Sequence, residues 1–127
     1  MAGTRNAVSV QINDHAGFIT FELRGVLYGS DLLKVTEQTY STLNNPWRYN
    51  RLYDLRAFVN VVQFEDLVAL SEQWQRIAGR DRPIRWAILT DDPVRLARTQ
   101  AFSPLFPDIM VRTFGTLANA ITWLTVG

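Results

Sequence analysis

Apolar and polar residues alternate near the start of the chain in the way that a half-buried β-strand requires. Val8, Val10 and Ile12 alternate with polar residues, and the stretch FITFELRGVL repeats the alternation with its apolar residues on one face. The sequence NDHAG between the two stretches supplies turn-forming residues. The pattern therefore predicts two strands that pair as an antiparallel hairpin.

In two longer segments, the apolar residues recur at the spacing of an α-helix instead of at every second position. The first helix is expected after Gly29, with Ser30 or Asp31 as its N-cap, and should run to about Leu43. The sequence NNP that follows ends this helix, because the residue before a proline avoids helical geometry. The second helix is expected at residues 64–78, where one apolar stripe recurs at helical spacing.

The rest of the chain continues to alternate strands and helices. The near-continuous apolar run IRWAILT is typical of a strand that is covered on both faces. Asp92 and Pro93 suit the N-cap and first turn of a third helix, and Thr116 suits the N-cap of a fourth. The elements predicted on these grounds are strands at residues 51–55, 84–90 and 109–114 and helices at residues 94–101 and 117–126.

This order, β-β-α-β-α-β-α-β-α, predicts a single-domain α/β sandwich. We expect a mixed, mostly parallel sheet of four or five strands, in which the N-terminal hairpin is the antiparallel part. The chain has 127 residues, which suits one domain, and no repeat or linker divides it. Residues 1–7 are expected to form a flexible N-terminus and residues 8–127 the domain.

Composition and charge exclude several classes of protein. The formal net charge of +1 gives no electrostatic reason to expect nucleic acid or an anionic membrane as a partner. The absence of cysteine excludes disulfides, thiol catalysis and cysteine-based zinc sites. The chain shows no signal peptide and no apolar run long enough to cross a membrane. We therefore expect a cytoplasmic location without stable membrane insertion.

Few residues are suited to catalysis, so we expect no catalytic, cofactor-binding or metal site. His15 is the only histidine and lies in the predicted hairpin turn, and no glycine-rich phosphate loop is present. Asp91 and Asp92 could ligate magnesium, but capping a helix is the simpler role for Asp92. Arg95 and Arg98 lie one helical turn apart and fit either an anion-binding pair or a solvated helix face.

The connection AFVNVVQF is unusually apolar for a segment between a strand and a helix. It follows a central strand, and ligands of open α/β sheets bind at the carboxyl ends of the strands. Its apolar side chains either form an exposed contact surface or fold inward over the sheet. The candidate binding surface comprises this connection and its neighbours: Asp54, Arg56, Phe58, Val59, Val61, Val62, Phe64, Asp91, Asp92 and Arg95.

The strand before this connection, RLYDLRAF, carries two charges of opposite sign. Alternation places Leu52, Asp54 and Arg56 on one side of the strand and Tyr53 and Leu55 on the other. The Cα atoms of Asp54 and Arg56 should lie about 6.5 Å apart, within ion-pairing reach of a long arginine side chain. We favour a structural clamp at the rim of the binding surface, with direct contact to a ligand as the alternative.

The hairpin, the segments YDLR and DDPVRLARTQAF, and the closing pattern from Phe114 to Leu124 together resemble the bacterial STAS/SEC14-like proteins. These proteins are related in fold to anti-sigma-factor antagonists, and the resemblance covers about residues 8–124. In regulatory STAS domains, a kinase phosphorylates a serine at the start of the helix after the central strand. Residues 43–70 of this chain contain neither serine nor threonine, so that switch does not carry over.

The resemblance implies a role in binding rather than in catalysis. We expect a non-enzymatic, cytoplasmic interaction or regulatory module, with a protein partner or a second copy of the chain at the candidate surface. The SEC14 side of the resemblance implies the alternative, a carrier or sensor of a small hydrophobic ligand, although the chain has no segment to spare for an enclosing lid. An enzyme is the least favoured class.

Overall fold

The computed structural model describes residues 7–77 and 84–126, and its element order is the one that the sequence predicts. The strands are β1 (Val8–Asn13), β2 (Phe18–Gly25), β3 (Asn50–Phe58), β4 (Ile84–Leu89) and β5 (Ile109–Phe114). The α-helices are α1 (Gly29–Ser41), α2 (Phe64–Ile77), α3 (Pro93–Phe102) and α4 (Leu117–Thr125). Two short 3₁₀ helices, η2 (Pro46–Arg48) and η3 (Ser103–Leu105), precede β3 and β5.

The five strands form one mixed sheet in which each strand lies beside the next one in the chain. The spatial order is β1-β2-β3-β4-β5. The hairpin β1–β2 is antiparallel, whereas β2, β3, β4 and β5 run parallel. The predicted single-domain α/β fold with a mostly parallel sheet is therefore confirmed.

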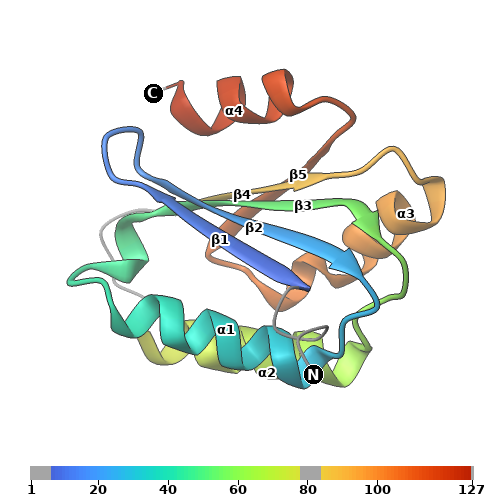
Figure 1. The fold of residues 1–127 in the computed structure, drawn as a ribbon, viewed down its shortest axis with the longest axis horizontal. Helices are drawn as coiled ribbons and strands as arrows, with labels where there is room; N and C mark the ends of the chain where they lie inside the picture. Colours follow the sequence, from blue (N-terminus) through green and yellow to red (C-terminus); the bar gives the residue numbers. More distant parts are fainter. Residues whose placement is uncertain (1–6, 78–83, 127) are drawn as a thin grey trace.

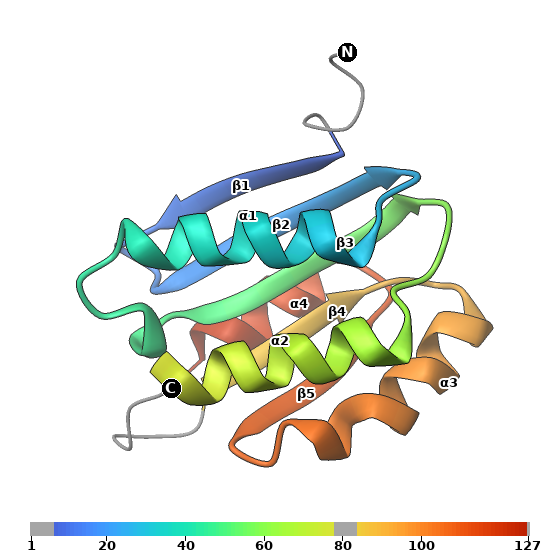
Figure 2. The ribbon, with the colours of Figure 1, turned by 90° about the horizontal axis from the view of Figure 1, so that it is seen from below.

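Helices cover both faces of this sheet. Connections between neighbouring parallel strands are almost always right-handed, so a sheet that grows in one direction places its crossover helices on one face. Accordingly, α1, α2 and α3 lie together on one side, and α4 lies alone on the other (Figures 1 and 2). None of the described helices is long and apolar enough to cross a membrane.

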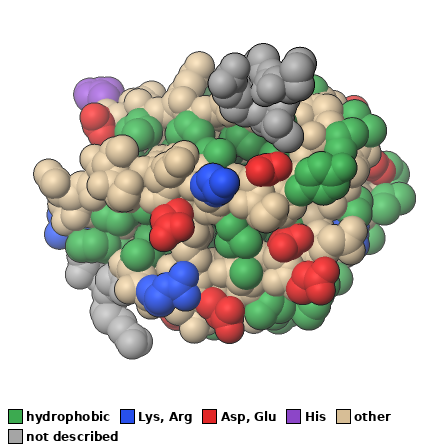
Figure 3. All heavy atoms as spheres, turned by 60° about the horizontal axis from the view of Figure 1, so that its bottom comes forward, with side chains coloured by type: hydrophobic (Ala, Val, Ile, Leu, Met, Phe, Trp, Pro, Cys, Tyr) green, Lys and Arg blue, Asp and Glu red, His purple; other side chains and the backbone are tan. Residues whose placement is uncertain are grey.

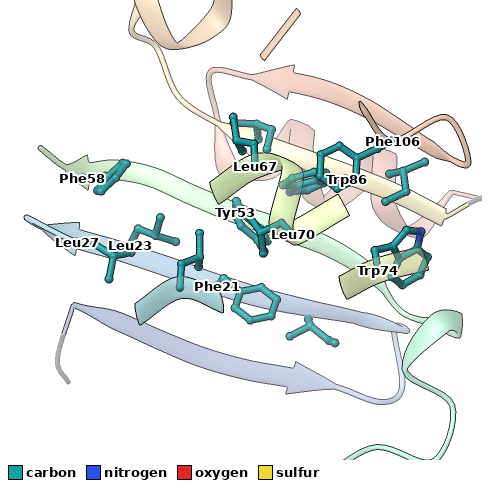
Figure 4. Packing of buried hydrophobic residues seen from close by; sticks show 14 of the residues in the cluster. Phe21, Leu23, Leu27, Tyr53, Phe58, Leu67, Leu70, Trp74, Trp86 and Phe106 are labelled. Carbon is teal, nitrogen blue, oxygen red and sulfur yellow. The ribbon is translucent and has the colours of Figure 1, made fainter. Parts of the chain in front are cut away.

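The main core lies between the sheet and the three helices on its first face. Figure 4 shows aromatic side chains from neighbouring strands and helices that meet there. The ring centroid of Tyr53 lies 5.0 Å from that of Phe21 and 4.9 Å from that of Trp86. The Trp86 ring in turn meets Phe106 edge-on at 4.9 Å. Such pairs contribute about 0.5–1.5 kcal/mol beyond the area that they bury.

A smaller core lies under α4 on the other face of the sheet. Phe18, Leu52 and Leu89 supply its strand side, and Ala120 and Leu124 supply its helix side. Polar bonds at the C-terminus of α4 support the same contact: Asn50 Nδ2 donates to the Leu124 carbonyl at 3.0 Å. With helices on both faces, β4 is almost completely buried, as its near-continuous apolar sequence predicts.

One cation is buried within the main core. The Arg51 side chain lies between two aromatic rings, with its guanidinium carbon 4.0 Å from the ring centre of Trp74 and 4.7 Å from that of Tyr40. Arg51 is only 3% exposed, and its Nε and Nη2 atoms have no hydrogen-bond partner among the described residues. Cation–π contact with the two rings therefore stands in for the usual carboxylate partner.

Two of the predicted helix caps are confirmed, and a third is wrong. The Asp92 side chain accepts a hydrogen bond from the Val94 amide at 2.9 Å, and that of Thr116 accepts one from Asn119. Helix α1 begins at Gly29 itself, two or three residues earlier than a cap at Ser30 or Asp31 would place it. Its N-cap residue is Tyr28, which makes no side-chain capping bond.

The start of α1 is packed tightly against the start of α2. A Cβ atom placed on Gly29 would lie 2.1 Å from Cγ and Oδ2 of Asp66 and 2.5 Å from its Cβ. The Asp66 carboxylate is thus at the N-terminal end of α1 and in the first turn of α2, where negative charge is stabilised by the helix dipole. Glycine is favoured at residue 29 because any larger residue there would collide with the Asp66 side chain.

The outer limits of the domain stay a prediction. Residues 1–6 of the expected flexible N-terminus, residue 78 at the expected end of the second helix, and the last residue, 127, lie outside the described residues. Ala7 was expected to belong to the flexible N-terminus. It is instead buried, with 5% of its surface exposed, and its carbonyl accepts a hydrogen bond from the Arg24 amide at 2.7 Å. Ala7 is therefore packed against the domain.

Candidate functional site

The candidate surface is built at the edge of the sheet where β2, β3 and β4 end. These three strands are parallel, so their carboxyl ends meet at one edge, followed by the loops that lead into α1, α2 and α3. The structure places the residues of the predicted surface at this edge but divides them between the two faces of the sheet.

Asp54 and Arg56 lie on the face of α4 and form the predicted clamp. Arg56 Nε donates to Asp54 Oδ1 at 3.0 Å, and Arg56 Nη2 donates to Asp54 Oδ2 at 2.9 Å. The Arg56 amide also donates to Asp54 Oδ1 at 3.1 Å. Both carboxylate oxygens are therefore engaged within the same strand, in the bidentate geometry that makes such pairs strong.

The electrostatics of this clamp favour a charged Asp54. Burial disfavours the carboxylate, but the hydrogen bonds from the Arg56 side chain and amide and the Arg56 charge outweigh it. Together they hold the pKa of Asp54 below its usual range. A carboxylate held in this way is a poor proton acceptor, which agrees with a structural role.

Phe58 lies on the opposite face from Asp54 and Arg56. Strict alternation would place residues 54, 56 and 58 on one side, but the pairing of β2 with β3 shifts between Glu22↔Asp54 and Arg24↔Ala57. This bulge adds one residue to β3 and reverses the faces beyond it. Phe58 consequently packs in the main core and is 7% exposed. The structure therefore separates Phe58 from Asp54 and Arg56, although all three belong to the predicted binding surface.

The loop after β3 is held firmly by Asn60. The Asn60 side chain accepts a hydrogen bond from the Leu27 amide at 3.0 Å and donates one to the Leu27 carbonyl at 2.8 Å. The Val59 amide adds a bond to the Gly25 carbonyl at 2.9 Å. The loops after β2 and β3 are therefore joined to each other.

Arg95 and Arg98 hold the same loop from α3. Arg95 Nη2 donates to the Phe58 carbonyl at 2.7 Å, and Arg98 Nη2 donates to the Val62 carbonyl at 2.5 Å. The Arg95 guanidinium also lies 4.7 Å from the centre of the Phe58 ring, and its Nε lies 3.4 Å from Asp92 Oδ2. The two arginines are thus neither a free anion-binding pair nor a solvated helix face.

The apolar connection AFVNVVQF has some side chains that fold inward over the sheet and others that are exposed, so each of the two predicted alternatives describes part of it. Phe58 is buried and Val62 is half-buried. Val59 is 69% exposed, Phe64 is 61% exposed and Val61 is 37% exposed. The inward side chains help to line an apolar cavity of about 60 Å³ beneath the loop, between β3, α2 and α3.

Asp91 and Asp92 take no part in a metal site within the described residues. Asp91 is exposed, whereas the Asp92 carboxylate caps α3 and lies close to Arg95. Across residues 7–77 and 84–126, no three acidic or histidine side chains are grouped closely enough to hold a metal ion. The capping role is therefore the one that the geometry supports for Asp92.

The exposed apolar side chains extend beyond the predicted surface. Val26 and Tyr28 in the loop after β2 are 54% and 62% exposed, and Val94 at the start of α3 is 64% exposed. Figure 3 shows hydrophobic side chains gathered at the right-hand end of the molecule, where Figure 1 places the tips of β2 and β3. We call this group the apolar rim; its members are Val26, Tyr28, Val59, Val61, Phe64 and Val94.

Three members of the apolar rim could have been found from the sequence. Val26, Tyr28 and Val94 are large apolar residues in or beside loops that follow predicted strands, the same signal that singled out the connection after β3. Considering every loop at the carboxyl edge of the parallel sheet, instead of the loop after β3 alone, would have added Val26, Tyr28 and Val94 to the candidate surface.

Comparison with solved structures identifies the fold. The chain is similar to a protein of the DUF3478 family with a SpoIIAA-like fold from Shewanella loihica, with a TM-score of 0.67 and 17% identity over 93% of this chain and 92% of that one. It is also similar to an anti-sigma factor antagonist from Mycobacterium paratuberculosis, with a TM-score of 0.57 and 16% identity over 94% of this chain and 95% of that one.

The fold of the chain is therefore STAS-like, as the sequence resemblance implied. No family model matches the sequence, and no curated protein matches it.

Proposed function

We propose that this chain is a non-enzymatic, cytoplasmic interaction or regulatory module that binds a protein partner through its apolar rim. The observation that carries the proposal is the gathering of six exposed apolar side chains at one sheet edge, on the loops after β2 and β3 and at the starts of α2 and α3. Exposed apolar groups of this kind mark protein interaction sites. The STAS-like fold, shared with a protein described as an anti-sigma factor antagonist, supports the same class of role.

Partner binding would not be controlled by phosphorylation in the segment that regulatory STAS domains use. Residues 43–70, which include β3, the loop after it and the first half of α2, contain no serine or threonine.

The test compares the rim with an exposed apolar residue elsewhere. We expect the double variant Val59→Ser, Phe64→Ser to lose a partner that the wild-type chain retains in affinity purification from its native cell. Met110→Ser should keep that partner, because Met110 is 49% exposed but lies on β5, away from the rim. Unfolding curves should show that all three proteins stay folded. Retention of every partner by the double variant would refute the proposal.

A second function, binding of a small hydrophobic ligand, is supported by the cavity beneath the loop after β3. Its lining is apolar, but its volume of about 60 Å³ is well below the roughly 300–1,000 Å³ of sites for drug-sized ligands. Native mass spectrometry of freshly purified protein separates the two functions, because a carrier would keep a non-covalent adduct. A bare protein mass, together with a rim-dependent protein partner, would favour the interaction module.

A further inference from the structure

Strand β1 forms one edge of the sheet, and its outer side pairs with none of the described residues. Among the described residues β1 pairs with β2 alone, and neither helix nor strand lies beyond it (Figure 2). Its six residues, VSVQIN, form an unbroken antiparallel ladder with β2 from Val8↔Leu23 to Asn13↔Phe18. The outer side of β1 therefore presents a regular row of backbone groups.

The register identifies which groups point outward. The Arg24 amide donates to the Ala7 carbonyl, so residue 7 belongs to a hydrogen-bonded pair. Hydrogen-bonded and non-hydrogen-bonded pairs alternate along an antiparallel ladder. Residues 7, 9, 11 and 13 therefore direct their amides and carbonyls toward β2, and Val8, Val10 and Ile12 direct theirs away from it.

This edge lacks the features that keep other edge strands from pairing. Natural edges carry charged residues, prolines or bulges, or are covered by another element. The sequence of β1 contains no charged residue and no proline, and its register with β2 is unbroken. By contrast, β5 at the other edge carries Arg112 near its middle.

We propose that two copies of the chain pair through β1, antiparallel, about a two-fold axis at Val10. With this axis Val10 lies opposite Val10 of the second copy, and Val8 lies opposite Ile12. Val8, Val10 and Ile12 of one copy then pair with Ile12, Val10 and Val8 of the other. Each of these three pairs exchanges two backbone hydrogen bonds, about six in all. The result is one continuous sheet with the five strands of each copy side by side.

Side-chain chemistry agrees with this register. Val8 and Val10 pack on the main core, so they and Ile12 lie on the face of α1, whereas Ser9 and Gln11 lie on the other face. A two-fold axis perpendicular to the sheet keeps each face continuous, so apolar residues meet apolar residues across the junction. Ile12, which is 40% exposed, gains Val8 of the second copy as a neighbour.

The lack of charge also favours a second copy over an unrelated extended segment. In an isologous contact, any charged residue near the axis faces the same charge on the other copy. Strand β1 avoids that repulsion completely, whereas β5 would bring two Arg112 side chains close together. An edge that binds a different chain would have no such need to be uncharged.

The test measures the mass of the full chain in solution and traps the contact covalently. Sedimentation equilibrium should give about twice the chain mass of 14.5 kDa at high concentration. Because the chain has no cysteine, Val10→Cys introduces the only thiol. Opposed Cα atoms in a hydrogen-bonded pair lie about 5.5 Å apart, which suits a disulfide. Val10→Cys should therefore oxidise rapidly to a covalent dimer.

Two further variants serve as controls. Val8→Cys is the matched control, because the two copies of residue 8 would be separated by about 14 Å along the strands and should crosslink far more slowly. Val10→Pro removes an outward amide without touching the ladder to β2, so it should give a folded monomer. A wild-type mass of 14.5 kDa at every concentration, or equal crosslinking of the two cysteine variants, would overturn the proposal. Faster crosslinking through Gln11→Cys would overturn the axis at Val10.

Discussion

The close approach of α1 and α2 makes a direct prediction about Gly29. In most helices a change from glycine to alanine is stabilising by up to about 1 kcal/mol, because alanine has the higher helix propensity and restricts the unfolded chain. The backbone of Gly29 has no positive φ angle, so nothing in its own conformation opposes the change. The obstacle is Asp66, whose Cγ and Oδ2 lie 2.1 Å and whose Cβ lies 2.5 Å from the position that a new methyl group would take.

Rotation of the Asp66 side chain moves Cγ and Oδ2 but leaves its Cβ in place, so the two helices must separate at their N-terminal ends. Overpacking of this kind typically costs about 1–3 kcal/mol, which exceeds the propensity gain. We therefore expect Gly29→Ala to lower the free energy of unfolding by about 1–2 kcal/mol and Tm by roughly 3–10 °C. Urea and thermal unfolding followed by circular dichroism would measure both.

Gly115→Ala is the matched control for this experiment. Gly115 also has an ordinary φ angle, and a Cβ there meets no atom within 4 Å, so this variant should be as stable as the wild type or slightly more stable. In the background Asp66→Ala, which removes Cγ and Oδ2, the cost of Gly29→Ala should fall. The reasoning would be refuted if Gly29→Ala matched the wild type while the control behaved as expected.

Three other predictions follow from the contacts described above. Because the pKa of Asp54 is lowered in the folded state, the ionised Asp54 carboxylate stabilises the fold. This contribution to the free energy of unfolding is fully present above the usual aspartate pKa of about 3.9 and disappears as the pH falls through the lowered value. Denaturant midpoints measured across this pH range should lack that contribution in Asp54→Asn. Asn60→Ala removes two hydrogen bonds to Leu27, so it should lower the free energy of unfolding by about 1–3 kcal/mol in urea titrations. The control Val59→Ala, at an exposed residue of the same loop, should change it by less than about 0.5 kcal/mol. Among the described residues Arg51 has no carboxylate partner, so its buried charge carries an uncompensated desolvation cost. Arg51→Met should therefore raise Tm, because methionine fills the space between the two rings without that cost; a fall in Tm would mean that the cation–π contacts outweigh it.

The element order and the sheet could be predicted from the sequence because their signals are local. Alternation marked the hairpin, helical spacing marked α1 and α2, and the caps at Asp92 and Thr116 depend on residues two and three positions away. The face of Asp54 followed from the same period of two. Such patterns need no knowledge of which segments meet in space.

The candidate site was less predictable because its determinants join distant residues. The position of Phe58 depends on a bulge in the pairing of β2 with β3, which alternation along β3 alone does not reveal. The roles of Asn60 and Arg95 depend on partners 33 and 37 residues away. The tight packing at Gly29 likewise depends on Asp66 in another helix.

The strand order has a consequence for how the chain folds. Every strand pairs with the strand before it, so no strand has to insert between two that are already paired. The hairpin β1–β2 is the most local pairing, and closing a short loop costs the least chain entropy. We expect the sheet to grow from this hairpin toward β5 in the order in which a ribosome makes the segments, with α4 closing over the second face last.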